Sequence, residues 1–363
     1  MEEIVYLQLT DFFISGGKCH YRIPVISVDK HGRIMCFANC RMNTVQDSAQ
    51  EVTLVLRRAE HPDSQWMALQ TLFEYKEWFG GIGTATVDEY GDQILLSYHQ
   101  GCRLSPNSDA ILKSNIKAGP FQLSSKDGGK NWRRAPLNIK KNAMGHIGGS
   151  HGSSTGITLK YGSRKGRLLT PARFQTAPGE ALETLQKHHY NCALYSDDHG
   201  DTWQTSGPVQ VGTGEGCLVE LSDGRIYYNS RAYFLDGRRR IAWSHNGGET
   251  FSDFGIDEEL TEPISGGCNA GIALYPVSLS DGKDIILFSN PAGENREQMT
   301  VRASFDGGQS WPVSRCIYTG PTAYSAMAVN NNGTIYVLYE NGIDYPYEKI
   351  SLARFNLTWL TEG

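Results

Sequence analysis

A short turn motif occurs four times in this chain and limits the folds that the chain can adopt. Each copy fits the pattern Ser-x-(Asp/Asn)-x-Gly-x-(Thr/Ser/Asn)-(Trp/Phe). The copies are SKDGGKNW (125–132), SDDHGDTW (196–203), SHNGGETF (244–251) and SFDGGQSW (304–311). They begin 71, 48 and 60 residues apart, so the repeating unit is about 50 to 70 residues long. A worn fifth copy without the glycines, LRRAEHPDSQW (56–66), lies upstream.

The chemistry of the motif predicts a tight hairpin. Its Asp or Asn accepts hydrogen bonds within the turn, its glycine adopts a positive φ, and its aromatic residue fixes the hairpin to the sheet below. A strand of alternating apolar and polar residues precedes each copy, as in RIAWS (240–244). Four-stranded units repeated around an axis are the blades of a β-propeller. Five copies and terminal strands that close the ring predict an all-β, six-bladed β-propeller with Asp-box hairpin turns. Without a linker or a break in composition, we expect a single domain over 1–363.

Composition excludes several classes of partner. With 34 basic and 39 acidic residues and a net charge of −5, the chain has no electrostatic basis for binding nucleic acid or an anionic membrane. No signal peptide or apolar span is evident, so we expect a cytoplasmic protein. The eight cysteines lack zinc-type or redox spacing and are expected to be free thiols in a reducing compartment. The histidines show no metal spacing either, so no metal or cofactor is expected, and the oligomeric state stays open.

Charged and phenolic residues stand at the ends of apolar strands, where a propeller places its site on the axis. The candidates, in chain order, are Arg22, Arg41, Asp47, Glu215, Arg231, Arg296 and Tyr324. Taken singly, each has a structural explanation, such as a surface arginine, a strand-end tyrosine or a solvated turn glutamate. Their order along the chain allows them to be interpreted together as one site.

The motifs around these residues resemble those of the exo-sialidases, which are retaining glycoside hydrolases with Asp-box propellers. Tyr21-Arg22-Ile23-Pro24 is similar to the Phe/Tyr-Arg-Ile-Pro signature. Arg41 and Asp47, followed by LVLRR, resemble the loop arginine and the acid/base aspartate. Glu215 precedes an EL-x-DG turn and then Asn229-Ser230-Arg231, Arg296 precedes the last Asp-box strand, and Tyr324 lies in an AYS motif. The resemblance covers nearly the whole chain.

The resemblance implies an exo-α-sialidase that acts on a sialylated glycan or a related keto-acid glycoside. It implies that Arg22, Arg231 and Arg296 bind the substrate carboxylate, which suits the two-pronged hydrogen bonding of guanidinium. Tyr324 would be the nucleophile, because a carboxylate nucleophile would be repelled by the substrate. A phenol with a pKa of about 10 needs a base, here Glu215. Asp47 would be the acid/base, and Arg41 either touches the substrate or orders the Asp47 loop.

Two departures leave the substrate open. Asn39 stands where many relatives carry an acidic residue, and Ala326 follows the AYS motif where an aspartate is common. The sugar is therefore N-acetylneuraminic acid, its deaminated analogue or another 2-keto-3-deoxy acid. The reaction also has alternatives: trans-sialidase or intramolecular trans-sialidase activity, or acidic-sugar binding without turnover. A binding module would need only the arginines, and a polysaccharide lyase would not need the Tyr324–Glu215 pair.

Overall fold

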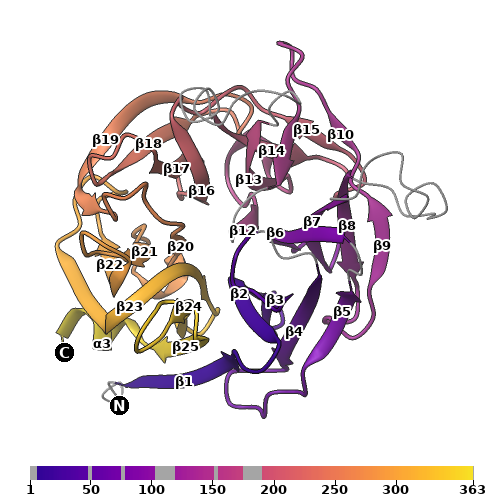
Figure 1. The fold of residues 1–363 in the computed structure, drawn as a ribbon. Helices are drawn as coiled ribbons and strands as arrows, with labels where there is room; N and C mark the ends of the chain where they lie inside the picture. The colour runs from indigo at the N-terminus through magenta and orange to yellow at the C-terminus, as the bar shows by residue number, and fades with distance from the viewer. Residues whose placement is uncertain are drawn as a thin grey trace.

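The computed structural model describes residues 6–47, 51–74, 78–102, 119–150, 154–174 and 190–362. Six blades surround a central axis (Figure 1), which confirms the predicted six-bladed β-propeller. In this part of the chain, no helix is long and apolar enough to cross a membrane. The only α-helix among the described residues is the short C-terminal α3 (Leu357–Glu362).

Each blade is an antiparallel sheet of four strands. Blade one comprises β2 (Cys19–Val28), β3 (Ile34–Met42), β4 (Val52–Ala59) and β5 (Gln70–Glu74). Blade two comprises β6 (Trp78–Asp88), β7 (Gln93–Cys102), β8 (Gly119–Ser125) and β9 (Arg133–Pro136). Blade three comprises β12 (Thr155–Thr158), β13 (Leu168–Phe174), β14 (Asn191–Ser196) and β15 (Trp203–Thr205), with β10 (Ile139–Lys140) and β11 (Gly148–Ser150) beside them. Blade four comprises β16 (Thr213–Glu220), β17 (Ile226–Ala232), β18 (Arg238–Ser244) and β19 (Ser252–Thr261).

One long strand, β23 (Val313–Val329), serves the last two blades. Its residues 313–321 pair with β22 (Glu297–Ser304) in blade five, beside β21 (Ile286–Pro291) and β20 (Gly271–Leu274). Its residues 322–329 pair with β24 (Ile335–Asn341) in blade six, which continues to β25 (Lys349–Phe355). The N-terminal β1 (Leu7–Ile14) pairs antiparallel with β25 and completes blade six. The two ends of the chain therefore close the ring, as expected from the sequence.

The core lies between adjacent blades, because each sheet is covered on both faces by its neighbours. Strands near the axis are accordingly buried throughout: every residue of β16 and of β24 is buried. The cluster that contains Leu169 of blade three and Tyr228 of blade four is one such inter-blade core. Buried strands of this kind read as continuous apolar runs, and a charged residue inside one requires a partner.

All four Asp boxes adopt the same hairpin between the third and fourth strands of a blade. The Asp or Asn Oδ1 accepts a bond from the motif serine at 2.8–3.0 Å and from the backbone N–H four residues later at 2.9–3.0 Å. The serine Oγ accepts from the N–H of the motif glycine, whose φ lies between +82° and +87°. Only glycine adopts this conformation readily, so the residue is fixed by the turn.

The box tryptophans of blades three and five join these blades to the preceding ones, which extends the predicted anchoring within one sheet. Trp203 of blade three donates to Gln122 of blade two at 3.0 Å. Trp311 of blade five donates to Asp257 of blade four at 2.9 Å. In the worn copy of blade one, Trp66 packs against Phe12 of blade six with ring centroids 4.6 Å apart. The repeated motif thus also stabilises the ring.

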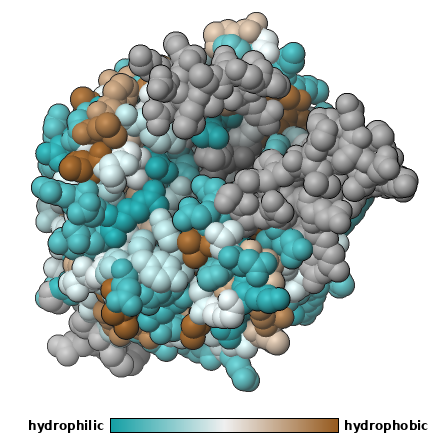
Figure 2. All heavy atoms as spheres, in the orientation of Figure 1, coloured by the Kyte–Doolittle hydropathy of each residue, from teal (hydrophilic) through white to brown (hydrophobic). Residues whose placement is uncertain are grey.

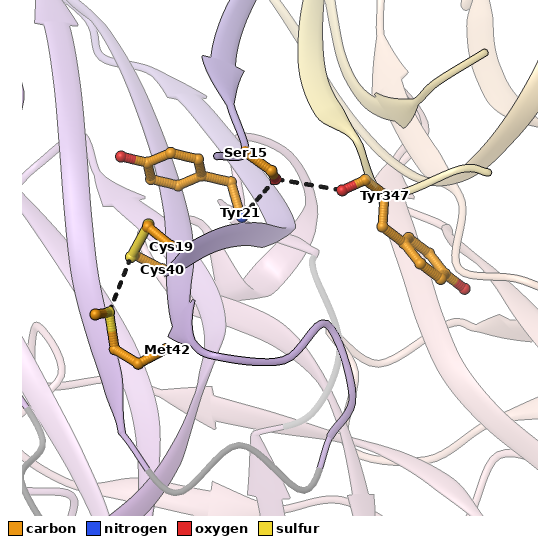
Figure 3. The surroundings of a disulfide bond; sticks show 6 residues. All are labelled: Ser15, Cys19, Tyr21, Cys40, Met42 and Tyr347. Carbon is orange, nitrogen blue, oxygen red and sulfur yellow. Dashed lines mark hydrogen bonds between the residues drawn. A yellow bond between two sulfur atoms is a disulfide. The ribbon is translucent and has the colours of Figure 1, made fainter. Parts of the chain in front are cut away.

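The prediction that all eight cysteines are free thiols is wrong, because Cys19 and Cys40 form a disulfide between β2 and β3 (Figure 3). The residues are 21 positions apart, and the strand register brings them together: Cys19 lies opposite Met42, and Tyr21 lies opposite Cys40. Sequence spacing carried no signal for this pairing, since the register depends on the folded sheet. Four of the five described free cysteines are buried: Cys36, Cys192, Cys217 and Cys268.

Candidate active site

Tyr324 and Glu215 meet across the propeller, although they come from blades six and four. Tyr324 lies in the second part of β23 and is 8% exposed, and Glu215 lies in β16 and is 5% exposed. The Tyr324 phenol donates a hydrogen bond to Glu215 Oε1. A buried carboxylate is therefore in direct contact with a phenol proton, which is the arrangement that a base-assisted phenol requires.

Local backbone irregularities place these side chains. The β16–β17 register shifts between Thr213 and Gly216, and the β23–β24 register shifts between Thr322 and Ser325. Both sites are bulge-like and redirect a side chain at the start of an inner strand. Gly216 is required here, since a Cβ at that position would lie 2.3 Å from the Tyr228 ring. The glycine that follows Glu215 is therefore needed for the close packing of this part of β16.

Arg231 completes a three-residue contact with this pair. Its Nη1 donates to Glu215 Oε2 at 2.7 Å and to the Tyr324 oxygen at 3.1 Å. Its Nε donates to the carbonyl of Gly266 at 2.7 Å. The guanidinium is therefore fixed at both ends, and its charge lies beside the phenol oxygen.

Burial and charge act in opposite directions on the Tyr324 phenol. Burial raises the pKa of Tyr324 well above its usual value, and the Glu215 carboxylate raises this pKa further. Arg231 and Arg296 oppose that rise. The balance leaves the phenol protonated at neutral pH, so its proton must be removed by a neighbour as it reacts. Burial by itself lowers the pKa of Arg231, but Glu215 and Tyr324 raise it more, and Arg231 stays charged.

Glu340 holds Arg22 and the backbone of Tyr324 together, and the sequence analysis did not identify it. Glu340 Oε1 accepts from Arg22 Nε at 2.6 Å and from the Ile23 N–H at 2.8 Å. Its Oε2 accepts from the N–H of Tyr324 at 3.1 Å. Glu340 is fully buried in β24. A single acidic residue in the apolar run IYVLYEN (335–341) was the signal that could have revealed it.

The departure at Asn39 also has a structural explanation. Asn39 is buried in β3 and pairs in register with Arg22 of β2. The carboxylate that compensates Arg22 comes instead from Glu340 in blade six. The charge of this arginine is therefore balanced from a different strand.

Tyr347, a second residue that the sequence analysis missed, contacts two of the arginines. Arg296 Nη1 donates to the Tyr347 oxygen at 2.8 Å, and Arg296 Nη2 reaches the Gly267 carbonyl at 3.5 Å. The guanidinium carbon of Arg22 lies 3.8 Å from the centre of the Tyr347 ring. Tyr347 belongs to the loop between β24 and β25, where no sequence pattern marked it.

Arg41 and Asp47 form a separate ion pair at the loop that follows β3. Arg41 is buried and contacts Asp47 at 2.8 Å, while the Asp47 side chain is 91% exposed. Arg41 also donates to the Val45 carbonyl at 2.7 Å, and Arg22 donates to the same carbonyl at 3.0 Å. Burial and the charge of Arg22 lower the pKa of Arg41. Arg41 thus contacts the Asp47 loop at two points, a side chain and a backbone carbonyl.

The four arginines of the site differ in whether a carboxylate balances their charge. Arg22, Arg41 and Arg231 each form an ion pair, with Glu340, Asp47 and Glu215 respectively. Within the described residues, Arg296 has only neutral hydrogen-bond partners. One partly buried cation is thus left for an anionic ligand. Viewed along the axis, the described surface around the centre of the ring is mostly hydrophilic (Figure 2).

The described ranges contain no group of three or more His, Cys, Asp or Glu side chains that could hold a metal ion.

Comparison with known proteins gives relatives along nearly the whole chain. The BNR repeat-like domain family matches residues 25–337. A sialidase of Micromonospora viridifaciens is 31% identical over 377 residues, which cover 96% of this chain and 54% of that protein. This chain thus spans about half the length of that relative.

Solved structures share the fold. A Hadza microbial sialidase has a TM-score of 0.75 and 22% identity, covering 94% of this chain and 66% of that chain. The intramolecular trans-sialidase from Ruminococcus gnavus has a TM-score of 0.74 and 15% identity, covering 95% of this chain and 96% of that chain. The matched repeats, the curated relative and the shared fold agree, and the chain belongs to the BNR repeat-like family and, within it, to the sialidase family.

Proposed function

We propose that this chain is a retaining exo-α-sialidase. It hydrolyses a terminal, α-ketosidically linked sialic acid, or a closely related 2-keto-3-deoxy acid sugar, through a covalent tyrosyl–glycosyl intermediate. The observation that carries the proposal is the hydrogen bond from the buried Tyr324 phenol to Glu215, inside a cluster of arginines. We call Arg22, Arg231 and Arg296 the arginine cluster.

The arginine cluster would bind the substrate carboxylate. Arg231 donates to the Tyr324 oxygen, and the guanidinium carbons of Arg22 and Arg296 lie 5.8 Å and 5.5 Å from the Tyr324 ring centre. An anion held by these groups is therefore adjacent to the phenol. Arg296, whose charge no described carboxylate balances, gains most from such a ligand.

Glu215 would act as the base for the first step. The Tyr324 oxygen attacks the anomeric carbon, its proton passes to Glu215, and the bond from that carbon to the leaving oxygen breaks. The pKa of Tyr324 is raised by burial and by Glu215, so the neutral phenol is the resting form. A neutral nucleophile avoids repulsion by the substrate carboxylate, which is why a tyrosine suits this substrate.

Asp47 would protonate the leaving oxygen and then remove a proton from the attacking water. Water displaces the Tyr324 oxygen from the anomeric carbon, and Glu215 returns the proton to the phenol. Two displacements at one carbon retain its configuration. The exposed carboxylate of Asp47 is accessible to an aglycone that extends into solvent.

A trans-sialidase or intramolecular trans-sialidase would use the same groups and differ only in the acceptor. The solved trans-sialidase relative shares the fold, so the products must separate the reactions. Free sialic acid identifies hydrolysis, and an anhydro sugar or a transferred sialic acid identifies the alternatives. A binding module without turnover has no use for the Tyr324–Glu215 contact.

The test is release of 4-methylumbelliferone from its α-ketoside of N-acetylneuraminic acid, by wild type and Tyr324→Phe side by side. We expect turnover by the wild type and a loss of several orders of magnitude in the variant. Tyr90→Phe, which changes an exposed tyrosine, is the control. No turnover of this or the deaminated ketoside by the wild type would overturn the activity. Full turnover by Tyr324→Phe would overturn only the tyrosyl intermediate.

A further inference from the structure

Tyr347 contacts Arg22 and Arg296 through two different parts of one side chain. Its ring face lies 3.8 Å from the guanidinium carbon of Arg22, a close cation–π contact. Its oxygen accepts the 2.8 Å bond from Arg296. Among the described residues, this is the shorter of the two hydrogen bonds of the Arg296 guanidinium, because the other measures 3.5 Å.

The two arginines differ in what else holds them. Arg22 has a buried carboxylate partner, Glu340, at 2.6 Å. Arg296 depends on neutral oxygens within the described residues. Without Tyr347, the two guanidiniums would share only the more distant Tyr324 ring, at 5.8 Å and 5.5 Å, and their like charges would favour separation. A single rigid ring that binds one on its face and the other at its oxygen fixes their spacing.

The backbone of Tyr347 is itself anchored to the strand that carries Arg22. The Ser15 hydroxyl donates to the Tyr347 carbonyl at 3.3 Å and accepts from the Tyr21 N–H at 3.0 Å. Figure 3 shows the carbonyl turned toward Ser15 and the ring directed away from it. The neighbouring Glu348 accepts three backbone N–H bonds of the same loop at 2.8–3.2 Å. The ring is thus presented from a loop with defined internal bonds.

We propose that Tyr347 is a positioning residue of the arginine cluster: it sets the spacing of Arg22 and Arg296 so that both reach one carboxylate. This inference rests on the proposed function, because the carboxylate is that of the substrate. It adds to the arginine cluster a residue that acts through those arginines. The loop between β24 and β25 therefore contributes to binding without supplying a charge.

Two substitutions separate the two contacts. Tyr347→Phe keeps the ring under Arg22 and removes the oxygen that Arg296 uses, whereas Tyr347→Leu removes both. We expect KM to rise about tenfold for the Phe variant, the size of one lost hydrogen bond to a charged group, and further for the Leu variant. The value of kcat should change less than KM, because the Tyr324–Glu215 contact is untouched. Tyr345→Phe, which removes an exposed phenol oxygen from the same loop, should match the wild type.

Binding of 2-deoxy-2,3-didehydro-N-acetylneuraminic acid, measured by calorimetry, tests the same contact without turnover. We expect its Kd to rise in the order wild type, Tyr347→Phe, Tyr347→Leu, with unchanged melting temperatures for wild type and Tyr347→Phe. If the wild type binds this acid but releases no sugar, the proposed activity fails while the order of Kd values still tests Tyr347. Equal KM and Kd for wild type and Tyr347→Phe, or no binding of the acid by the wild type, would overturn the inference.

Discussion

Glu215 of blade four accepts a hydrogen bond from the phenol of Tyr324 of blade six, across the axis of the propeller. The two residues are 109 positions apart, and each lies beside a shift in strand register. Arg231 contacts both side chains and donates to the Glu215 oxygen that the phenol does not use. The contact gives the buried phenol a proton acceptor, and the first prediction follows from it.

Replacing Glu215 by glutamine should lower kcat while leaving KM much less affected. An amide of the same shape can still touch Tyr324 and Arg231, but it cannot take the phenol proton. We expect a loss of roughly 10²- to 10⁴-fold in kcat, as for other deleted general bases. Steady-state kinetics with the 4-methylumbelliferyl ketoside measures it. Glu220→Gln, in the same buried strand, is the control, and an equal effect of both changes would contradict the role of Glu215.

Glu340→Gln should destabilise the fold and weaken binding together. The change leaves the buried Arg22 without its carboxylate and weakens the bond to the Tyr324 N–H. Breaking a buried ion pair costs about 3 kcal/mol of unfolding free energy. Denaturant unfolding measures this loss, and KM should rise because Arg22 loses its carboxylate partner. Glu60→Gln breaks a more exposed pair with Arg58 and should cost under about 1 kcal/mol. Equal losses of unfolding free energy in Glu340→Gln and Glu60→Gln would show that the buried Arg22–Glu340 pair contributes no more than an exposed one.

The effect of Asp47→Asn should depend on the leaving group. A glycan hydroxyl leaves poorly unless it is protonated, whereas 4-methylumbelliferone is a good leaving group without help. We expect kcat/KM to fall roughly 10²-fold or more on 3′-sialyllactose and much less on the 4-methylumbelliferyl ketoside. Asp63→Asn removes another exposed carboxylate that pairs with an arginine and should have little effect. Similar losses of Asp47→Asn on both substrates would argue against acid catalysis.

Glu220 should make stability depend on pH. This residue is 7% exposed, and its carboxylate accepts the backbone N–H groups of Lys160 and Tyr161 at 2.6 and 3.2 Å. Burial raises the pKa of Glu220 from 4.5 to about 7, although these hydrogen bonds oppose the rise. The native state therefore binds more protons than the unfolded state between pH 4.5 and 7. Stability from this group is present below that window and is lost as the pH rises through it.

Glu220→Gln removes this titration. The difference in unfolding free energy, variant minus wild type, should rise by up to about 3 kcal/mol from pH 5 to pH 8. Denaturant unfolding at both pH values measures the difference. A wild-type-to-variant difference that is the same at both pH values would refute the assignment.

Local chemistry determined much of the fold. The Asp boxes encode a hairpin through contacts within eight residues, and their repetition fixed the propeller and its blades. The terminal strands were also readable, because closure of the ring needs a partner for β25. Short motifs, each at the start or end of one strand, identified the candidate residues Arg22, Glu215, Arg231 and Tyr324.

The repeat, the strands and the candidate residues could therefore be predicted before folding, since each depends on neighbours along the chain. Which of these residues contact one another depends on how the blades assemble into the ring. The sequence did not predict the roles of Glu340 and Tyr347 or the Cys19–Cys40 disulfide, because each depends on a partner from another strand. Glu340 in its apolar strand and Tyr347 in its loop have a role only because the folded ring places an arginine beside each of them. Strand register and ring closure act over hundreds of residues, and no local pattern records the contacts that they create.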